Sequence, residues 1–397
     1  MSSDFEIVQG VLVKYHGQSP TVTLPAGVKA IGPGAFSYAN LTEVVFNEEV
    51  TQIGPRAFKA NQLTRVHLPP QLESIEEEAF RENKLTTLTL PGTVRSLGEL
   101  SFYNNALTEL IIPDQVQKVG DQAFRENRLQ TVTLGQRLTH IGHGAFRGNQ
   151  LTSLELDVAW IGDEAFRGNH LKAITWGDQL THIGSRAFRD NLLLEVTLPP
   201  SVTHVGEGAF RDNQLTQFVF SQAMTELSRE VLRGNQLTAI CLPEQTTTIG
   251  DEAFRENLIQ AVHFPDGVVQ VGKGAFQENE LSQLVLNLAL TTIGQEAFRL
   301  NGLVQVSLPP KLMSIGDFAF SYNKLTQVSL PQAVQQVGKG AFRYNHLRNA
   351  VLTDGLYHLG QGAFENNDPT LAFDIVADNR GEADRVLALM GKGWVIT

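Results

Sequence analysis

The sequence predicts a mainly β solenoid with short helical turns, about 16 rungs long, with a parallel sheet on one face. Two observations predict it. A phenylalanine recurs at steps of 22 residues, and a short apolar–polar alternation follows it in most steps. A unit this short cannot bury a core of its own, so copies must stack and cover one another's apolar faces. The recurring residues are Phe36, Phe58, Phe80, Phe102, Phe124, Phe146, Phe166, Phe188, Phe210, Phe254, Phe276, Phe298, Phe320, Phe342 and Phe364.

The repeat has regular columns when positions are counted from this phenylalanine. Position +3 is Asn in fifteen of sixteen copies, and we expect this buried amide to bond backbone groups of the turns. Positions +8 and +10 are apolar, which indicates a strand with these side chains inward and +7 and +9 outward. Proline is frequent at +11 and ends the strand, because it has no N–H to donate to a ladder.

The segment around each phenylalanine predicts one helical turn per rung. The Gly at +18 is often followed by a residue suited to a first helical turn, such as Asp121, Asp163 or Asp251. A brief extended piece precedes that Gly. Two rungs depart from the rule, because the step shortens to 20 residues between Phe146 and Phe166 and Leu232 replaces one phenylalanine.

The ends of the chain predict two caps, because an open stack of repeats must be covered at both ends. Residues 1–19 predict an N-terminal hairpin cap, with strands at Phe5–Val8 and Val11–Tyr15. Residues 20–368 form the predicted solenoid.

Residues 369–397 form the predicted C-terminal cap. There we expect a strand at Leu371–Val376, a helix at Glu382–Met390 and a final strand at Trp394–Thr397. Neither a linker nor a second domain is expected.

The repeat unit reads N-x-L-T-x-V-x-L-P-x-x-V-T-x-I-G-x-x-A-F-R-x. This motif resembles the BspA-type leucine-rich repeat family, in a variant with Asn and 22-residue repeats, over about residues 20–368. The resemblance implies a leucine-rich repeat solenoid of bacterial type. It also implies a role in cell adhesion or protein binding, commonly at a microbial surface.

The composition narrows the classes of partner and the compartment. A net charge of −11 argues against a general affinity for nucleic acid or anionic lipid. One cysteine excludes an internal disulfide framework. The sequence as written shows neither a signal peptide nor an apolar run long enough to span a bilayer. The compartment is therefore unknown: the sequence as written points to the cytoplasm, whereas the family resemblance implies a cell-surface or secreted protein.

Signs of chemistry are sparse, and we expect no enzyme, no cofactor and no metal site. The motifs of serine hydrolases, P-loop proteins and zinc proteases are all absent from the sequence. Cys241 is interpreted as a lone exposed thiol. His182, His204 and Glu226 share a column on three consecutive rungs, but the spacing of stacked rungs favours a plain polar surface over a shared ion.

An arginine column at +1 has two interpretations, a groove for polyanions or a charge-neutralised ridge. Acidic residues at +2 and in the preceding turn favour the ridge, because stacked arginines would otherwise repel one another. The column consists of Arg81, Arg125, Arg147, Arg167, Arg189, Arg211, Arg233, Arg255, Arg299 and Arg343.

The outward positions of six successive rungs carry no charge and are the predicted partner-binding surface. An uncharged sheet face is the surface best suited to meet another protein, although drift of the repeat would give the same pattern. The residues are Gln217, Val219, Ala239, Cys241, Ala261, His263, Gln283, Val285, Gln305, Ser307, Gln327 and Ser329.

The shortened rung is a second candidate. There the turn is reduced to five residues, Leu156 to Trp160, and Trp176 ends the next strand, so we expect the two tryptophans close together at a notch. The notch is either a hot spot or sugar platform, or a tolerated deletion that the tryptophans fill. The other irregular stretch, Ser221–Leu232, is expected to loosen the stack.

The pattern predicts a non-enzymatic scaffold that binds a protein or glycoprotein through the outward sheet face, and the family resemblance implies that this scaffold is of adhesin type. The alternative is a structural or self-associating solenoid, because the uncharged face could also pair with a copy of itself. A crystal-surface binder is disfavoured, since the threonine column at +6 is interrupted at several rungs.

Overall fold

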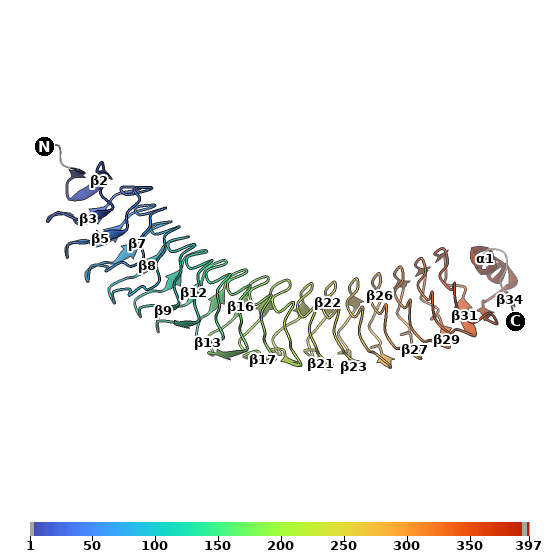
Figure 1. Ribbon diagram of the computed structural model, residues 1–397. Helices are drawn as coiled ribbons and strands as arrows, with labels where there is room; N and C mark the ends of the chain where they lie inside the picture. Colours follow the sequence, from blue (N-terminus) through green and yellow to red (C-terminus); the bar gives the residue numbers. More distant parts are fainter. Residues whose placement is uncertain (1–3, 391–394, 397) are drawn as a thin grey trace. The chain divides into compact units, whose positions relative to one another are not determined.

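The computed structural model describes residues 4–390 and 395–396 and divides the chain into two compact units, Met1–Leu193 and Leu194–Thr397. In each unit the rungs follow one another along the stack (Figure 1). A typical rung contributes two short strands, one from the alternating segment and one from the extended piece before the Gly.

In the first unit the strands of the extended pieces form one long sheet, and the alternating segments form short sheets of two strands. The long sheet contains β1 (Phe5–Val8), β2 (Val11–Tyr15), β4 (Ala30–Ile31), β6 (Gln52–Ile53), β7 (Ser74–Ile75), β8 (Ser96–Leu97), β10 (Lys118–Val119), β12 (His140–Ile141), β14 (Trp160–Ile161) and β16 (His182–Ile183). The short sheets pair β3 (Thr21–Thr23) with β5 (Glu43–Val45), β9 (Glu109–Ile111) with β11 (Thr131–Thr133), and β13 (Ser153–Leu156) with β15 (Ala173–Trp176).

The second unit repeats this arrangement. After β18 (His204–Val205), one sheet contains β20 (Glu226–Leu227), β22 (Thr248–Ile249), β24 (Gln270–Val271), β26 (Thr292–Ile293), β28 (Ser314–Ile315), β30 (Gln336–Val337) and β32 (His358–Leu359). The alternating segments form β17 (Glu195–Thr197), β19 (Gln217–Val219), β21 (Ala239–Cys241), β23 (Ala261–His263), β25 (Leu284–Val285), β27 (Val306–Ser307), β29 (Gln327–Ser329) and β31 (Asn349–Thr353).

The 22-residue step is also the register of the sheets. Ile53 pairs with Ile31 and Ile75 in parallel ladders, so residues of one sequence column become neighbours on successive rungs. The predicted solenoid with parallel sheets is therefore confirmed.

The phenylalanine column forms the core. All fifteen side chains are at most 3% exposed, as predicted. In the first unit successive rings from Phe36 to Phe188 stack with centroids 5.0 to 5.6 Å apart. In the second unit, where Leu232 replaces a ring, Phe218 and Phe220 supply the aromatic contact. Phe218 lies 5.1 Å from Phe210 and Phe220 lies 6.4 Å from Phe254, between ring centroids.

The asparagine column works as the sequence predicts. Asn61 donates from Nδ2 to the carbonyls of Phe36 and Phe58, both at 2.9 Å. Its Oδ1 accepts the backbone N–H of Leu41 at 2.8 Å. One side chain thus satisfies three buried backbone groups and ties two rungs together.

The segment expected to be a helical turn forms consecutive hydrogen-bonded turns instead. Ala57 N–H bonds to Gly54 O and Lys59 N–H to Arg56 O, while Arg56 has φ of 58°. A left-handed residue in the middle prevents a right-handed helix from continuing. The aspartates after the Gly also act differently, because Asp121 accepts the backbone N–H of His143 in the next rung at 3.0 Å.

The two N-terminal strands have the predicted bounds. Strands β1 and β2 pair antiparallel, and β2 continues in parallel onto β4. Tyr15 extends the aromatic column, with its ring centroid 5.3 Å from that of Phe36.

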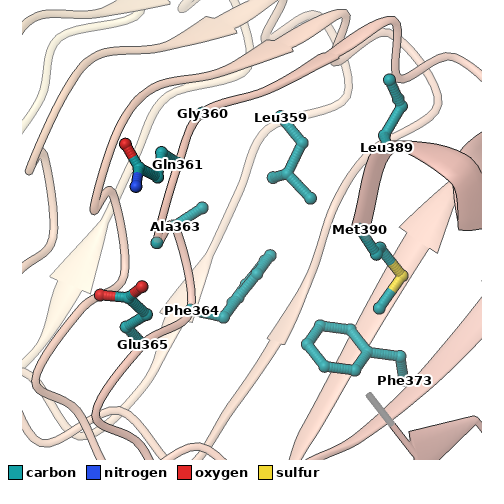
Figure 2. Close-up of a pocket in the computed structure, with 10 residues that line it drawn as sticks. Leu359, Gly360, Gln361, Ala363, Phe364, Glu365, Phe373, Leu389 and Met390 are labelled. Carbon is teal, nitrogen blue, oxygen red and sulfur yellow. The ribbon is translucent and has the colours of Figure 1, made fainter. Parts of the chain in front are cut away.

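The C-terminal cap consists of β33 (Ala372–Val376), α1 (Arg380–Met390) and β34 (Val395–Ile396). The predicted final strand includes Trp394 and Thr397, which lie outside the described residues. A pocket of about 410 Å³ lies between the last rung and α1. Figure 2 shows Leu359 and Phe364 of the last rung on one side of it and Met390 of α1 on the other. The cap thus covers the end of the phenylalanine column, since Phe364 is almost fully buried.

Candidate functional site

The predicted partner-binding residues are all exposed, and together they form what we call the outward face. They lie on or directly before six strands of the second unit, from β19 to β29. Between them, the inward side chains of Phe218, Ile240, Val262, Leu284 and Val328 are buried. The pleat therefore separates the two sets as expected.

Ladder register aligns the outward side chains into rows. Cys241 pairs with His263, His263 with Val285, and Val285 with Ser307. A row of neighbouring side chains therefore runs across four rungs, and it carries no formal charge when the histidine is neutral.

The outward face is nevertheless built from three short sheets rather than one continuous ladder. Strands β21, β23, β25 and β27 form one sheet, whereas β19 pairs with β17 and β29 pairs with β31. The sequence gives no sign of these interruptions, because the repeat columns continue across them.

A shallow hollow lies at the interruption between β27 and β29. Ser307, Gln327 and Ser329 of the outward face lie on its lining. Val306 and Leu308, at positions buried in most rungs, also line it and are half-buried here. The hollow therefore offers apolar surface beneath a polar rim, which suits an anchoring side chain from a partner.

Further exposed apolar side chains lie close in sequence to the outward face. Val285 is 73% exposed and Leu288 is 71% exposed, and Val304 on the next rung is also exposed. The signal for Leu288 and Val304 was present in the sequence, as aliphatic residues in columns that are otherwise mostly polar or Pro.

The arginine column is a neutralised ridge, as predicted. Each of its ten arginines has a carboxylate within 4.0 Å. The acidic side chains at position −2 lie deepest. Glu78 is buried and bonds Lys59, Arg56 and Arg81. Burial alone would raise the pKa of Glu78, but the hydrogen bonds from Lys59 and Arg56 outweigh it and lower the pKa to about 2.

Glu230 occupies the same position in the irregular rung. Burial opposes its charge, yet the bonds from Arg211 and the nearby Arg229 and Arg233 lower its pKa. A ridge whose arginines are already paired has little charge left to hold a polyanion.

The expectation that Trp160 and Trp176 lie together at one edge is wrong. Trp160 lies in β14, points outward and is 42% exposed, whereas Trp176 ends β15 and packs edge-on against Phe188 at 5.5 Å. The two strands belong to different sheets. The short turn after Leu156 crosses from one sheet to the other, so the tryptophans on either side of it face different surroundings.

In the part of the chain that the structure describes, the column of His182, His204 and Glu226 contains no group of convergent metal ligands. His182 instead stacks on Trp160 with ring centroids 3.5 Å apart. Cys241 is a free, exposed thiol within the outward face.

Four segments of the chain match the model of the BspA type leucine rich repeat region, namely residues 15–108, 96–160, 159–282 and 269–378. The chain belongs to the BspA-type leucine-rich repeat family. No curated protein sequence matches it. The BspA-type repeat thus accounts for the 22-residue step, the buried asparagine and the stacked phenylalanines in one unit.

Solved structures of bacterial leucine-rich repeat proteins resemble this one. One from Bacteroides ovatus is 20% identical, with a TM-score of 0.56 over 92% of this chain and 94% of that chain. One from Eubacterium ventriosum is 17% identical, with a TM-score of 0.44 over 90% and 88% of the two chains. YopM from Yersinia enterocolitica is 18% identical, with a TM-score of 0.37 over 91% and 92%. The likeness to the Bacteroides protein concerns the fold, which is that of a leucine-rich repeat scaffold.

Among residues 4–390 and 395–396, none of the helices has both the length and the apolar character needed to cross a lipid bilayer.

Proposed function

We propose that this BspA-type chain is a non-enzymatic scaffold of adhesin type that binds a protein or glycoprotein through its outward face. The observation that carries the proposal is the face itself. Twelve exposed side chains on six rungs hold no formal charge, on a chain whose net charge is −11.

Desolvation favours this surface over the rest of the molecule. Removing Val, Ala, Ser or Gln side chains from water costs far less than removing the paired charges of the arginine ridge. The apolar centre around Val285 and Leu288 adds the area that drives association. The hollow at Ser307 and Ser329 gives a partner's side chain a place to anchor.

Placing charges in the centre of the face tests the proposal. The double variant Ala261→Glu and Val285→Lys should abolish partner capture, because both charges would be buried without partners in the complex. The matched control is Gln270→Glu with Gln336→Lys, which puts the same charges on exposed positions of the other sheet. Both variants should unfold at nearly the wild-type temperature.

The measurement is pull-down from the native source with all three proteins, followed by calorimetry with each purified candidate. A partner must bind wild type and control, and bind the face variant at least about tenfold more weakly, a change of about 1.4 kcal/mol. A partner that binds all three proteins equally would place the binding surface elsewhere.

Self-association through the same face is the second candidate, favoured by the row of outward Gln283, Gln305 and Gln327 on neighbouring rungs. Light scattering after size exclusion decides it. A dimer that the Ala261→Glu and Val285→Lys variant dissociates would support self-association, and a monomer at all concentrations would exclude it.

A further inference from the structure

The arginine ridge changes its character near the C-terminal end of the second unit. In five rungs, the last of them that of Glu296, a glutamate at position −2 pairs with the arginine three residues later. After Glu296 this position holds Phe318 and then two glycines, Gly340 and Gly362. The turns that follow therefore lack the carboxylate that neutralises the ridge elsewhere.

Two tyrosines and two arginines form a continuous stack on these turns. The rings of Tyr322 and Tyr344 stack with centroids 4.5 Å apart. The guanidinium of Arg299 lies 5.3 Å from the centre of the Tyr322 ring, and that of Arg343 lies 4.9 Å from the centre of the Tyr344 ring. We call these four side chains, together with Lys324 and Lys339 of the same turns, the tyrosine patch.

The tyrosines occupy a backbone position that does not favour them. Tyr322 and Tyr344 have φ of 58° and 57°, in the left-handed region that Gly, Asn and Asp adopt more readily than bulky residues. Other rungs place Asn104, Gly148 and Asp190 in the same column. Because both rings are exposed, by 41% and 39%, the core does not account for them. A backbone cost kept for an exposed side chain points to a role at the surface.

The chain around the patch is basic, although its net charge is −11. Residues 297–348 contain six Lys or Arg and one acidic residue, Asp317. The preceding residues 244–296 contain eight Asp or Glu and two Lys or Arg. The following residues 349–385 contain seven Asp or Glu and two Lys or Arg. A basic band thus lies between two acidic bands along the chain.

The cations of the patch are only partly neutralised. Arg343 has a carboxylate partner in Glu365 at 3.6 Å, and the glutamate side chain is 48% exposed. Lys324 and Lys339 are exposed, and neither forms an ion pair with any residue that the structure describes. The nearby Asp317 accepts the backbone N–H of Lys339 at 2.7 Å. Positive charge is therefore left over for a ligand on these turns.

We propose that the tyrosine patch binds a short acidic segment of a protein partner. Guanidinium, ammonium and phenol groups all donate hydrogen bonds to carboxylates. The stack spans three rungs, or about 10 Å, which is the length of about three residues of extended chain. A long polyanion lying along the stack would reach the acidic bands on both sides and be repelled there. A short acidic segment avoids this repulsion.

The patch lies on turns, whereas the outward face lies on strands β19 to β29, so neither proposal requires the other. The test is fluorescence anisotropy of labelled hexaglutamate titrated with the full chain at low ionic strength, with labelled hexaglutamine as the neutral probe. Hexaglutamate should bind with a dissociation constant below about 1 mM, and hexaglutamine should not bind.

Two double variants address the two parts of the patch. Lys324→Glu with Lys339→Glu should weaken the binding of hexaglutamate about tenfold or more. Tyr322→Asn with Tyr344→Asn should weaken it severalfold. Asparagine already occupies this column at Asn104, so the tyrosine variant is expected to fold.

The matched control is Lys118→Glu with Lys172→Glu, which makes the same change in net charge at exposed positions of the first unit and should leave the affinity unchanged. Any of four results would overturn the proposal. Hexaglutamate could fail to bind, the control could lose as much affinity as the lysine variant, or the tyrosine variant could keep full affinity. The fourth is tighter binding of hexathymidylate or a heparin hexasaccharide than of hexaglutamate.

Discussion

Thr246 occupies a column where neighbouring rungs bury an aliphatic side chain, such as Val202, Val268 or Leu290. It is fully buried, and its hydroxyl is without a hydrogen-bond partner in the described structure. A buried hydroxyl in this state has lost its water without recovering a bond, so it lowers the stability of the folded chain.

Thr246→Val should therefore raise the free energy of unfolding by about 1 kcal/mol. Urea unfolding followed by circular dichroism would measure the gain. The control is Thr247→Val on the adjacent exposed residue, whose hydroxyl donates to Thr225 O at 3.3 Å and whose loss should give no gain. An unchanged midpoint for the Thr246 variant would mean that the hydroxyl has a partner.

At this scale much could be predicted from the sequence. The sequence column alone predicts that the asparagine at +3 forms hydrogen bonds with backbone groups of the turns. The side chain of Asn61 forms three such bonds. Asp121 was misjudged, because its spacing from the Gly suits a helix cap equally well. Only the three-dimensional stack shows that His143 N–H is the nearer donor.

The irregular rung shows how one element compensates for another. Leu232 lacks the ring of its column, and the inward Phe218 and Phe220 of the preceding strand segment fill the place beside Phe210 and Phe254. Both rings are buried, as is Leu232. The sequence predicts a weakened rung here, because its column lacks a ring. The column does not reveal that side chains from another column fill the space.

Leu232→Phe should consequently destabilise the chain although it restores the repeat, since the space is already occupied. Overpacking of this kind costs about 1–3 kcal/mol. Combining it with Phe220→Leu, which returns that column to its usual residue, should recover most of the loss. Thermal unfolding of the three proteins gives the answer, and a gain in stability for the single variant would contradict the packing.

The buried carboxylate of Glu78 makes the stability of its turn depend on pH. Its pKa is lowered from 4.5 to about 2 in the folded chain. A depressed folded-state pKa contributes stability above the unfolded value, and this contribution is lost as pH falls from about 4.5 to about 2. Glu78→Gln should thus be less stable than wild type at pH 7, and the difference should shrink across that window.

Urea midpoints at pH 7, 4 and 2.5 would follow the difference. Glu99→Gln is the control, because Glu99 is exposed and should shift the curve little at any pH. A constant gap between Glu78→Gln and wild type from pH 7 to 2.5 would show that the carboxylate is not held in its charged form.

The positions of the strands were largely predictable from the sequence, whereas the turn conformations and the breaks between sheets were not. Strand positions follow from the +8 and +10 alternation, as in Ala261–His263. The helical turn was misjudged because Gly, Glu, Gln and Arg share position −2, and side chains alone do not reveal that Arg56 and Glu78 adopt positive φ. The break between β27 and β29 likewise leaves no mark in the repeat columns.

Across the molecule the repeat divides its surfaces by charge. The turns carry paired arginines and glutamates, and the alternating strands of the second unit carry the uncharged outward face. Each rung of the stack is held in place by its neighbours, so both surfaces are ordered as soon as the chain folds. A rigid face loses little conformational freedom when a partner binds. This rigidity supports the proposed role in recognition.

Oxidative footprinting of side chains tests the outward face most directly. Hydroxyl radicals label exposed Cys241, His263 and Val285 readily in the free chain, and His140 and Met313 outside the face serve as internal controls. With a purified partner bound, labelling of the three face residues should fall severalfold while the controls stay unchanged. Unchanged labelling of Cys241, His263 and Val285 in the saturated complex would contradict the central claim.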